Sequence, residues 1–124
     1  MILVDTSVWV DHFRRGNDGL ARLLNAGRVW SHEFVIGELA GGNLRRRSRV
    51  LHYLSNLPRA ATARHEEVLE LIERRRLYGA GLGWVDAHLL TAALIEGFPL
   101  WTLDKPLVAA AQRVSVSVSA ADIE

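Results

Sequence analysis

The sequence predicts an α/β fold, in which helices cover both faces of a parallel sheet. Three features of the chain lead to this prediction. Short apolar runs with the length of buried strands recur along the chain, and segments with the spacing of amphipathic helices separate them. Glycine or proline stands at many of the boundaries. Because parallel strands need crossover connections of a dozen or more residues, this alternation favours parallel pairing over hairpins.

The expected strands are short apolar runs bounded by polar or turn-forming residues. Ile2-Leu3-Val4 opens the chain, and the run from Leu100 to Leu103 has the same character. The stretch from Arg59 to Ala63 is less apolar and predicts only a weak strand. We therefore expect a central parallel sheet of four to five strands, at residues 2–4, 28–31, 59–63, 100–103 and 114–118.

The expected helices begin at capping residues and end at glycine or proline. Thr6 or Ser7 caps the first helix, which ends at Gly16, and Asp18 caps the second, which ends near Gly27. The other helices follow from apolar residues three and four positions apart, at about residues 34–40, 43–56, 65–77, 84–96 and 106–113.

Length and composition limit the possible classes of protein. A chain of 124 residues with 49% hydrophobic content suits a single domain, residues 1–124, with a real core. The net charge of +1 neither demands nor excludes a nucleic-acid partner. The absence of cysteine excludes disulfides, thiolate metal sites and cysteine nucleophiles. No apolar run approaches the roughly 20 residues of a membrane span and no signal peptide is recognisable, so we expect a cytoplasmic protein without membrane contact.

Four acidic residues stand on or directly after apolar segments. Asp5 follows the first strand, and Asp104 follows the strand at residues 100–103. Glu38 lies on the apolar side of the third helix, and Asp86 shares a helix face with leucines. Ligands of open parallel sheets bind beyond the carboxyl ends of the strands, where strand order reverses. If the strands of Asp5 and Asp104 flank that point, we expect all four carboxylates to face one cleft.

Converging carboxylates indicate a particular chemistry. Like charges repel at short distance, and a divalent cation removes the repulsion. Oxygen ligands suit Mg²⁺ or Mn²⁺, which combine a few carboxylates with waters and substrate phosphate oxygens. A metal site of this kind can hydrolyse phosphodiesters by activating water and neutralising the leaving oxygen. The hydroxyls of Thr6, Ser7 and Thr102 are expected to hydrogen-bond these carboxylates or a metal-bound water.

Each of these residues also has a simpler explanation. Asp5 and Asp104 each stand where they could cap a helix, and Asp86 could favour the positive end of its helix. The three hydroxyls could be caps or strand-end polar groups. Glu38 is harder to explain in this way, because an acid on the apolar side of a helix needs a partner.

The segments around these acids together resemble those of PIN-domain ribonucleases, specifically the VapC-type toxins of VapBC toxin–antitoxin pairs. The resemblance covers essentially the whole chain. It is carried by Asp5-Thr6-Ser7, Val35-Ile36-Gly37-Glu38-Leu39, Trp84-Val85-Asp86-Ala87-His88-Leu89-Leu90 and Thr102-Leu103-Asp104-Lys105. One departure is Leu107, which stands where the family often has an aromatic residue shortly after the last acid.

The resemblance implies a fold, a site and partners. The fold is a three-layer α/β/α domain, and the metal-binding catalytic residues are Asp5, Glu38, Asp86 and Asp104, with Mg²⁺ or Mn²⁺ as cofactor. The activity is that of an endoribonuclease that cleaves tRNA or rRNA and restrains translation. The partners are a cognate VapB-type antitoxin and a second copy of the chain in a homodimer.

Two other functions remain open at this point. A non-catalytic PIN module could inhibit by binding RNA or protein, and a DNA nuclease could use the same cleft. The arginines at positions 45, 46, 47 and 49, and those at 74–76, could contact RNA phosphates, although a solvated helix face explains both groups as well.

Overall fold

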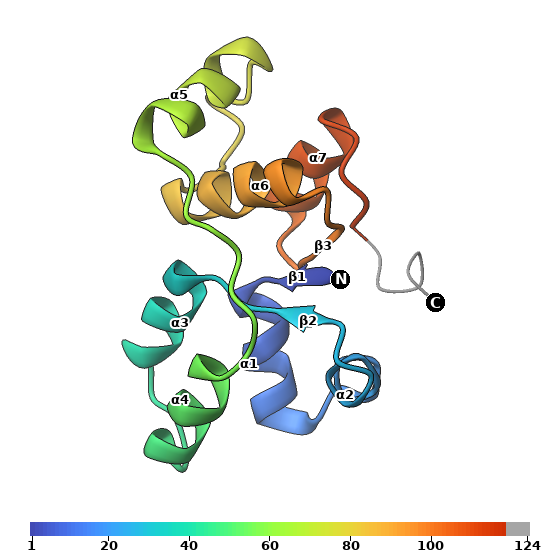
Figure 1. Ribbon diagram of the computed structural model, residues 1–124. Coiled ribbons are helices and arrows are strands. Elements are labelled where there is room, and N and C mark those ends of the chain that lie inside the picture. Colours follow the sequence, from blue (N-terminus) through green and yellow to red (C-terminus); the bar gives the residue numbers. More distant parts are fainter. Residues whose placement is uncertain (119–124) are drawn as a thin grey trace.

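A three-stranded parallel sheet lies at the centre of the computed structural model, which describes residues 1–118 (Figure 1). The strand order is β2-β1-β3. The strands are β1 (Ile2–Val4), β2 (Val29–Trp30) and β3 (Leu100–Trp101). Leu3 of β1 pairs with Trp30 on one side and with Leu100 on the other, so β1 is the central strand.

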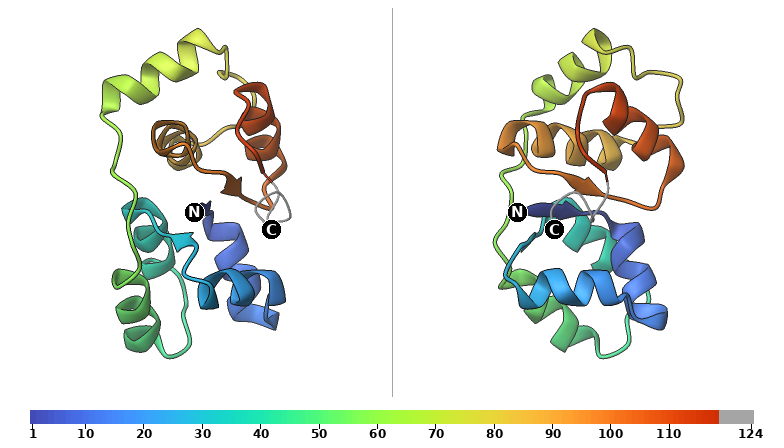
Figure 2. Two further views of the ribbon diagram at one scale, coloured as in Figure 1. Left: turned by 45° about the vertical axis from the view of Figure 1, so that its right-hand side comes forward. Right: turned by 90° about the vertical axis from the view of Figure 1, so that its right-hand side faces the viewer.

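Helices lie on both sides of the strands, as the alternating pattern predicts. Figures 1 and 2 show α1 to α4 on one side and α5 to α7 on the other. The helices within residues 1–118 are α1 (Thr6–Arg15), α2 (Asp18–Asn25), α3 (Glu33–Ala40), α4 (Arg47–Ser55), α5 (His65–Arg74), α6 (Trp84–Glu96) and α7 (Lys105–Arg113). The α/β class is therefore confirmed.

The sheet has fewer strands than the four to five expected. In place of a strand at residues 59–63, a single parallel bridge joins Ser31 to Arg59. Pro58 lacks an N–H, and residues 61 and 62 are exposed, so nothing extends this bridge into a ladder. The expected strand at residues 114–118 is also wrong. Ser115 has a φ of 62°, which ends α7 in a turn, and residues 116–118 form no strand, although the Leu100 N–H donates to the Ser117 carbonyl at 2.8 Å.

Two helix starts differ from the expected ones. Asp5, and not Thr6 or Ser7, is the N-cap residue of α1, and its side chain makes no capping hydrogen bond. Asn17, and not Asp18, caps α2, because its Oδ1 accepts a hydrogen bond from Leu20 N at 3.0 Å.

Left-handed residues limit two other helices. Arg46 has a φ of 52°, so α4 begins at Arg47 and not at Asn43. Arg76 has the same φ, and α5 ends two residues before it, short of the expected end at Leu77. Neither local conformation was visible in the hydrophobic pattern, because arginine is a good helix former.

The core fills the space between sheet and helices. All three residues of β1 are buried, and Trp9, Leu20, Leu54 and Leu90 are buried around them. Leu107 is also fully buried. The position that often carries an aromatic residue in VapC-type toxins is thus filled by an aliphatic core residue.

A pair of arginines joins the ends of α5 and α7. Arg113 donates hydrogen bonds to the carbonyls of Arg75 at 3.2 Å and Arg76 at 3.3 Å, and Arg75 donates to the carbonyl of Arg113. These cations therefore satisfy helix-terminal carbonyls, where positive charge is favourable. Arg74 pairs with Glu70 at 3.3 Å. The guanidinium groups of Arg74 and Arg75 thus have partners within the protein.

Within residues 1–118, no helix combines the length and apolar character that crossing a membrane requires.

Core packing on α6 can be tested with two leucines that lie one turn apart. Leu90 is fully buried, whereas Leu94 is 38% exposed. We expect Leu90→Ala to lower the free energy of unfolding by about 2–5 kcal/mol, because it leaves a cavity. Leu94→Ala should change it by less than about 1 kcal/mol. Urea denaturation followed by circular dichroism measures both, and equal losses would contradict the packing described here.

Candidate functional site

The candidate site lies at the carboxyl ends of β1 and β3. β1 has β2 on one side and β3 on the other, so the strand order reverses at β1. Ligands of open parallel sheets bind beyond the strand ends at such a point. Asp5 directly follows β1, and Asp104 follows the end of β3 by three residues. The condition under which the sequence predicts a shared cleft is therefore met.

Asp5 is a buried carboxylate held by two hydroxyls. It is only 4% exposed. Its Oδ2 accepts hydrogen bonds from Ser7 Oγ and from Thr102 Oγ1, each at 2.8 Å. Its backbone N–H donates to the Trp101 carbonyl at 2.9 Å, which continues the pairing of β1 with β3. The side chain is thus oriented by the sheet and by hydroxyls rather than used as a helix cap.

The same two hydroxyls connect α1 to the loop after β3. Ser7 Oγ accepts a hydrogen bond from Leu103 N, and Thr102 Oγ1 accepts one from Asp104 N, both at 3.0 Å. Asp104 is half-buried at the N-cap position of α7, and its side chain makes no capping hydrogen bond. Ser7 and Thr102 therefore hold both the carboxylate of Asp5 and the backbone of Asp104.

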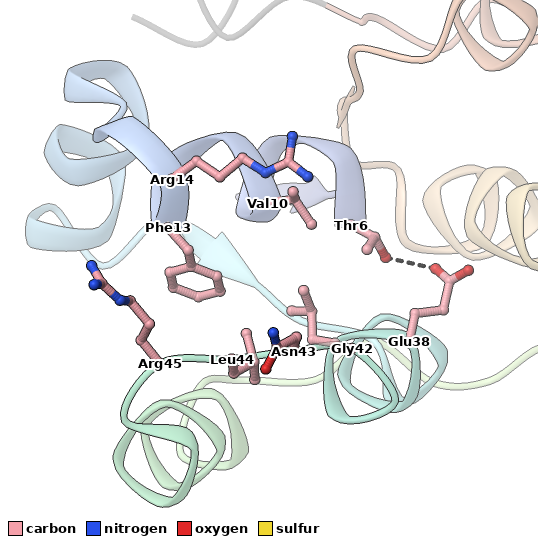
Figure 3. A pocket seen from close by; sticks show the side chains of 10 residues that line it. Thr6, Val10, Phe13, Arg14, Glu38, Gly42, Asn43, Leu44 and Arg45 are labelled. Carbon is pink, nitrogen blue, oxygen red and sulfur yellow. Dashed lines mark hydrogen bonds between the residues drawn. The ribbon is translucent and has the colours of Figure 1, made fainter.

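Glu38 does not lie on the buried side of its helix, contrary to the sequence prediction. Its neighbours Val35 and Leu39 face the core, and Glu38 is exposed on the other side of α3. Glu38 Oε1 accepts a hydrogen bond from Thr6 Oγ1 at 2.6 Å, which links α3 to α1 (Figure 3). The residue still reaches the cleft, but it does so from the solvent-facing rim.

Asp86 connects the four carboxylates electrostatically. Its Oδ2 accepts a hydrogen bond from Gly83 N at 3.0 Å, so it does stabilise the start of α6. Burial raises the pKa of Asp86 above 3.8, the Gly83 hydrogen bond opposes this rise, and the charges of Asp5, Asp104 and Glu38 raise the pKa further. The three other acids are thus close enough to act on Asp86, and no cation contributes to its shift.

The arrangement is an open acidic cleft and not a closed metal cage. Within residues 1–118, no three His, Asp or Glu side chains form a ready-made cluster for a metal ion. Mg²⁺ does not require such a cage, because it commonly keeps several waters and uses one or two carboxylates together with substrate phosphates. Three carboxylates that raise the pKa of a fourth supply oxygen donors that fit a divalent cation of this kind.

Two buried histidines, His32 and His88, lie at the contact between α3 and α6. His32 caps α3 by accepting a hydrogen bond from Phe34 N at Nδ1, and burial lowers the pKa of both His32 and His88. Their rings form a row with aromatic side chains: His32 to Phe34 (5.2 Å between centroids), Phe34 to His88 (4.6 Å), His88 to Trp84 (4.8 Å) and Trp84 to His65 (5.0 Å).

This row packs α3 against the first turns of α6. Neutral imidazoles pack there without a buried charge, and the contact sets the spacing between the helices that carry Glu38 and Asp86. The four-residue spacing of Trp84 and His88 was the only signal in the sequence, and it indicates a shared helix face without naming the partner across it.

Comparison with known families agrees with this geometry. The model of the family described as "PIN domain" matches residues 2–112. The chain belongs to the PIN domain family. Ribonuclease VapC32 of Mycobacterium tuberculosis is 48% identical to this PIN domain over 120 residues, which cover 96% of this chain and 97% of VapC32. The resemblance to VapC-type toxins predicted from the four acidic segments is therefore confirmed.

Solved structures share the fold at low sequence identity. A toxin–antitoxin complex from Klebsiella pneumoniae matches with a TM-score of 0.70 and 20% identity, over 97% of this chain and 98% of that chain. PAE2754 from Pyrobaculum aerophilum matches with a TM-score of 0.67 and 21% identity, over 98% and 92% of the two chains. At this identity the comparison supports the PIN fold.

The electrostatic coupling in the cleft can be measured directly. We expect carbon-detected NMR titration to place the pKa of the Asp86 carboxyl above 3.8. In Asp104→Asn this pKa should move down, because one repelling charge is gone. Asp18→Asn, an exposed residue on α2, is the control and should leave the pKa of Asp86 unchanged. An Asp86 pKa that ignores Asp104→Asn would contradict the convergence.

The same coupling predicts how stability depends on pH. Because the pKa of Asp86 is higher in the folded state, folding becomes less favourable as pH rises from 3.8 through the folded pKa. Asp86→Asn removes this ionisation and keeps an oxygen for the Gly83 N–H. The difference in the free energy of unfolding, Asp86→Asn minus native chain, should therefore increase as pH rises through this range. Urea denaturation at a series of pH values measures it.

Proposed function

We propose that this PIN domain is a metal-dependent endoribonuclease that acts as the toxin of a type II toxin–antitoxin pair and restrains translation. One observation carries the proposal: the charges of three acids, from the end of β1, from α3 and from the N-cap of α7, all raise the pKa of Asp86 on α6, and no cation offsets them there. The 48% identity to a protein named Ribonuclease VapC32 supports RNA as the substrate.

The metal in this proposal is Mg²⁺, with Mn²⁺ as a substitute. Asp5, Asp86 and Asp104 would hold it, and Glu38 would complete the set from the rim of the cleft. When bound, the ion supplies an activated water and neutralises charge on the leaving oxygen. The protein residues do the positioning. Ser7 and Thr102 keep the Asp5 carboxylate in one orientation, and ligands that are oriented in advance hold a metal more tightly.

Glu38 has a different place in the proposal. It is exposed, and its hydrogen bond to Thr6 leaves it at the open side of the cleft. A carboxylate in this position can orient a water molecule by accepting a hydrogen bond from its O–H group. Thr6 orients Glu38 in the same way that Ser7 and Thr102 orient Asp5.

The proposed partners are RNA, specifically tRNA or rRNA, a VapB-type antitoxin and a second copy of the chain. A fold neighbour is a toxin–antitoxin complex, and the VapC-type relatives imply an antitoxin for this chain as well. An acidic cleft without its own cation suits a basic side chain of an inhibitor.

A non-catalytic PIN module that inhibits by binding RNA or protein is the second candidate, because no three-ligand metal cluster is present in residues 1–118. EDTA separates the two functions. Hydrolysis stops when the metal is removed, whereas inhibition by occupancy continues. A DNA nuclease on the same cleft is excluded if excess single-stranded DNA fails to compete with RNA for cleavage.

The central test is the substitution Asp5→Asn. We expect it to lower the rate of RNA cleavage in Mg²⁺ by about 100-fold or more, since a metal ligand contributes several kcal/mol to the reaction. Asp18→Asn, which removes an exposed carboxylate from α2, should cleave at the native rate. Gel assays of labelled RNA measure both rates. Full activity of folded Asp5→Asn in Mg²⁺ would refute the assigned site.

The hydroxyl that orients Asp5 gives a second test. Thr102→Val removes its hydrogen bonds to Asp5 and from Asp104 N but preserves shape, so we expect the Mg²⁺ concentration for half-maximal cleavage to rise about 10- to 100-fold. Thr102→Ser keeps the hydroxyl and should restore most of the affinity. If valine and serine behave alike, the hydroxyl does not orient the site.

A further inference from the structure

A pocket of about 590 Å³ opens beside the carboxylates. It lies between α1 and the loop that follows α3, and Thr6 and Glu38 line the end nearest the cleft (Figure 3). From that end the pocket continues along α1 past Val10 to Phe13. A pocket of this size, partly apolar and with a few polar groups, is typical of a site for a small ligand or one unit of a polymer.

An aromatic ring faces this pocket. The Phe13 side chain points into it, and the residue is 36% exposed (Figure 3). Trp9, which is buried, stacks against Phe13 with ring centroids 5.8 Å apart and an interplanar angle of 29°. The ring is thus supported by the core and remains accessible from the pocket. An exposed aromatic face with this support is what a stacked nucleic-acid base requires.

Two cations and an amide also line the pocket. Arg14 comes from α1, and Asn43 and Arg45 come from the opposite loop (Figure 3). None of the three side chains forms a hydrogen bond or an ion pair with any other part of residues 1–118. Two neighbouring arginines are engaged instead, because Arg15 pairs with Asp11 at 2.6 Å and Arg47 donates to the Gly42 carbonyl at 3.3 Å. The cations of Arg14 and Arg45 are thus available to a ligand in the pocket.

We propose that this pocket binds one unpaired nucleotide of the substrate RNA beside the cleavage site, with the base stacked on Phe13, the phosphates on its two sides at Arg14 and at Arg45, and Asn43 hydrogen-bonded to the base edge. The inference rests on the proposed ribonuclease function and extends it to substrate recognition. Arginines and an amide supply phosphate and base-edge contacts, and stacking supplies affinity that tolerates different bases.

The position of the charges favours RNA over a peptide helix as the occupant. The Arg14 side chain extends past Val10 toward Thr6, and Arg45 lies on the other side of Phe13 (Figure 3). A nucleic-acid strand that leaves a metal-bearing cleft along this pocket would thus place its successive phosphates near these two cations. The base has to be unpaired, because a stacked duplex base offers no free face to Phe13. The pocket thus selects single-stranded segments such as loops.

Binding is measured without cleavage, in EDTA, by fluorescence anisotropy with fluorescein-labelled oligouridylate and oligoadenylate. Phe13→Leu should weaken binding roughly tenfold, and Phe13→Trp should retain it, because stacking needs an aromatic ring. Arg14→Gln and Arg45→Gln should each weaken binding and reduce the slope of log affinity against log salt by about 0.7. Tyr78→Leu and Arg74→Gln, exposed positions outside the pocket, are the controls and should bind as the native chain does.

Cleavage in Mg²⁺ separates this inference from the proposed function. If the native chain cleaves RNA and Phe13→Leu raises KM with little change in kcat, both the nuclease assignment and the nucleotide pocket are supported. If it cleaves and the pocket variants keep the native KM and affinity, the pocket inference is wrong and the nuclease assignment stands. If it fails to cleave while the binding differences appear, the nuclease assignment fails and the nucleotide pocket stands. Pocket variants that bind RNA normally but lose an amphipathic helical peptide would overturn the inference in favour of protein docking.

Discussion

The buried carboxylate of Asp5 is the constraint on which the site depends. It stands at the end of the central strand, where water is excluded, and such a group is costly unless it is hydrogen-bonded. Ser7 and Thr102 supply these bonds from α1 and from the residue after β3. The same hydroxyls hold the backbone before Asp104, so one polar network fixes two acids and the edge of the sheet together.

The remaining acids show what the fold has to withstand. The pKa of Asp86 is raised because the residue is partly buried and faces three like charges. The repulsion among these carboxylates lowers the stability of the fold, and packing elsewhere must offset that loss. The rings of His32, Phe34, His88 and Trp84 provide that packing between α3 and α6, and burial lowers the pKa of both imidazoles, which favours their neutral form. On both α3 and α6, aromatic rings pack the two helices together, while the acids Glu38 and Asp86 lie beside those rings and face the cleft.

The positions of Asp5 and Asp104 could be predicted from the sequence, because a residue that closely follows a buried strand lies at the carboxyl end of the parallel sheet. Glu38 was predicted for the wrong reason, since only the rotation of α3 decides that Val35 is buried and Glu38 exposed. Strand number was overestimated where a turn at Ser115 and the proline at position 58 prevent pairing. The roles of the arginines could not be predicted either: Arg75 braces two helix ends and Arg45 lines a pocket, although both stand in similar basic runs.

Because β1 pairs with β3, the carboxylate cleft can assemble only late in the synthesis of the chain. β1 is made before β3, the strand that Thr102 follows, and non-local pairs of this kind form late in folding. Until then Asp5 lacks one of its hydroxyl partners, and the acids of α6 and α7 are not yet in place. A nascent chain therefore has no assembled cleft before the segment with Thr102 has been synthesised and has folded. The order of strands in the sheet thus delays assembly of the cleft until β3 and Thr102 have been made.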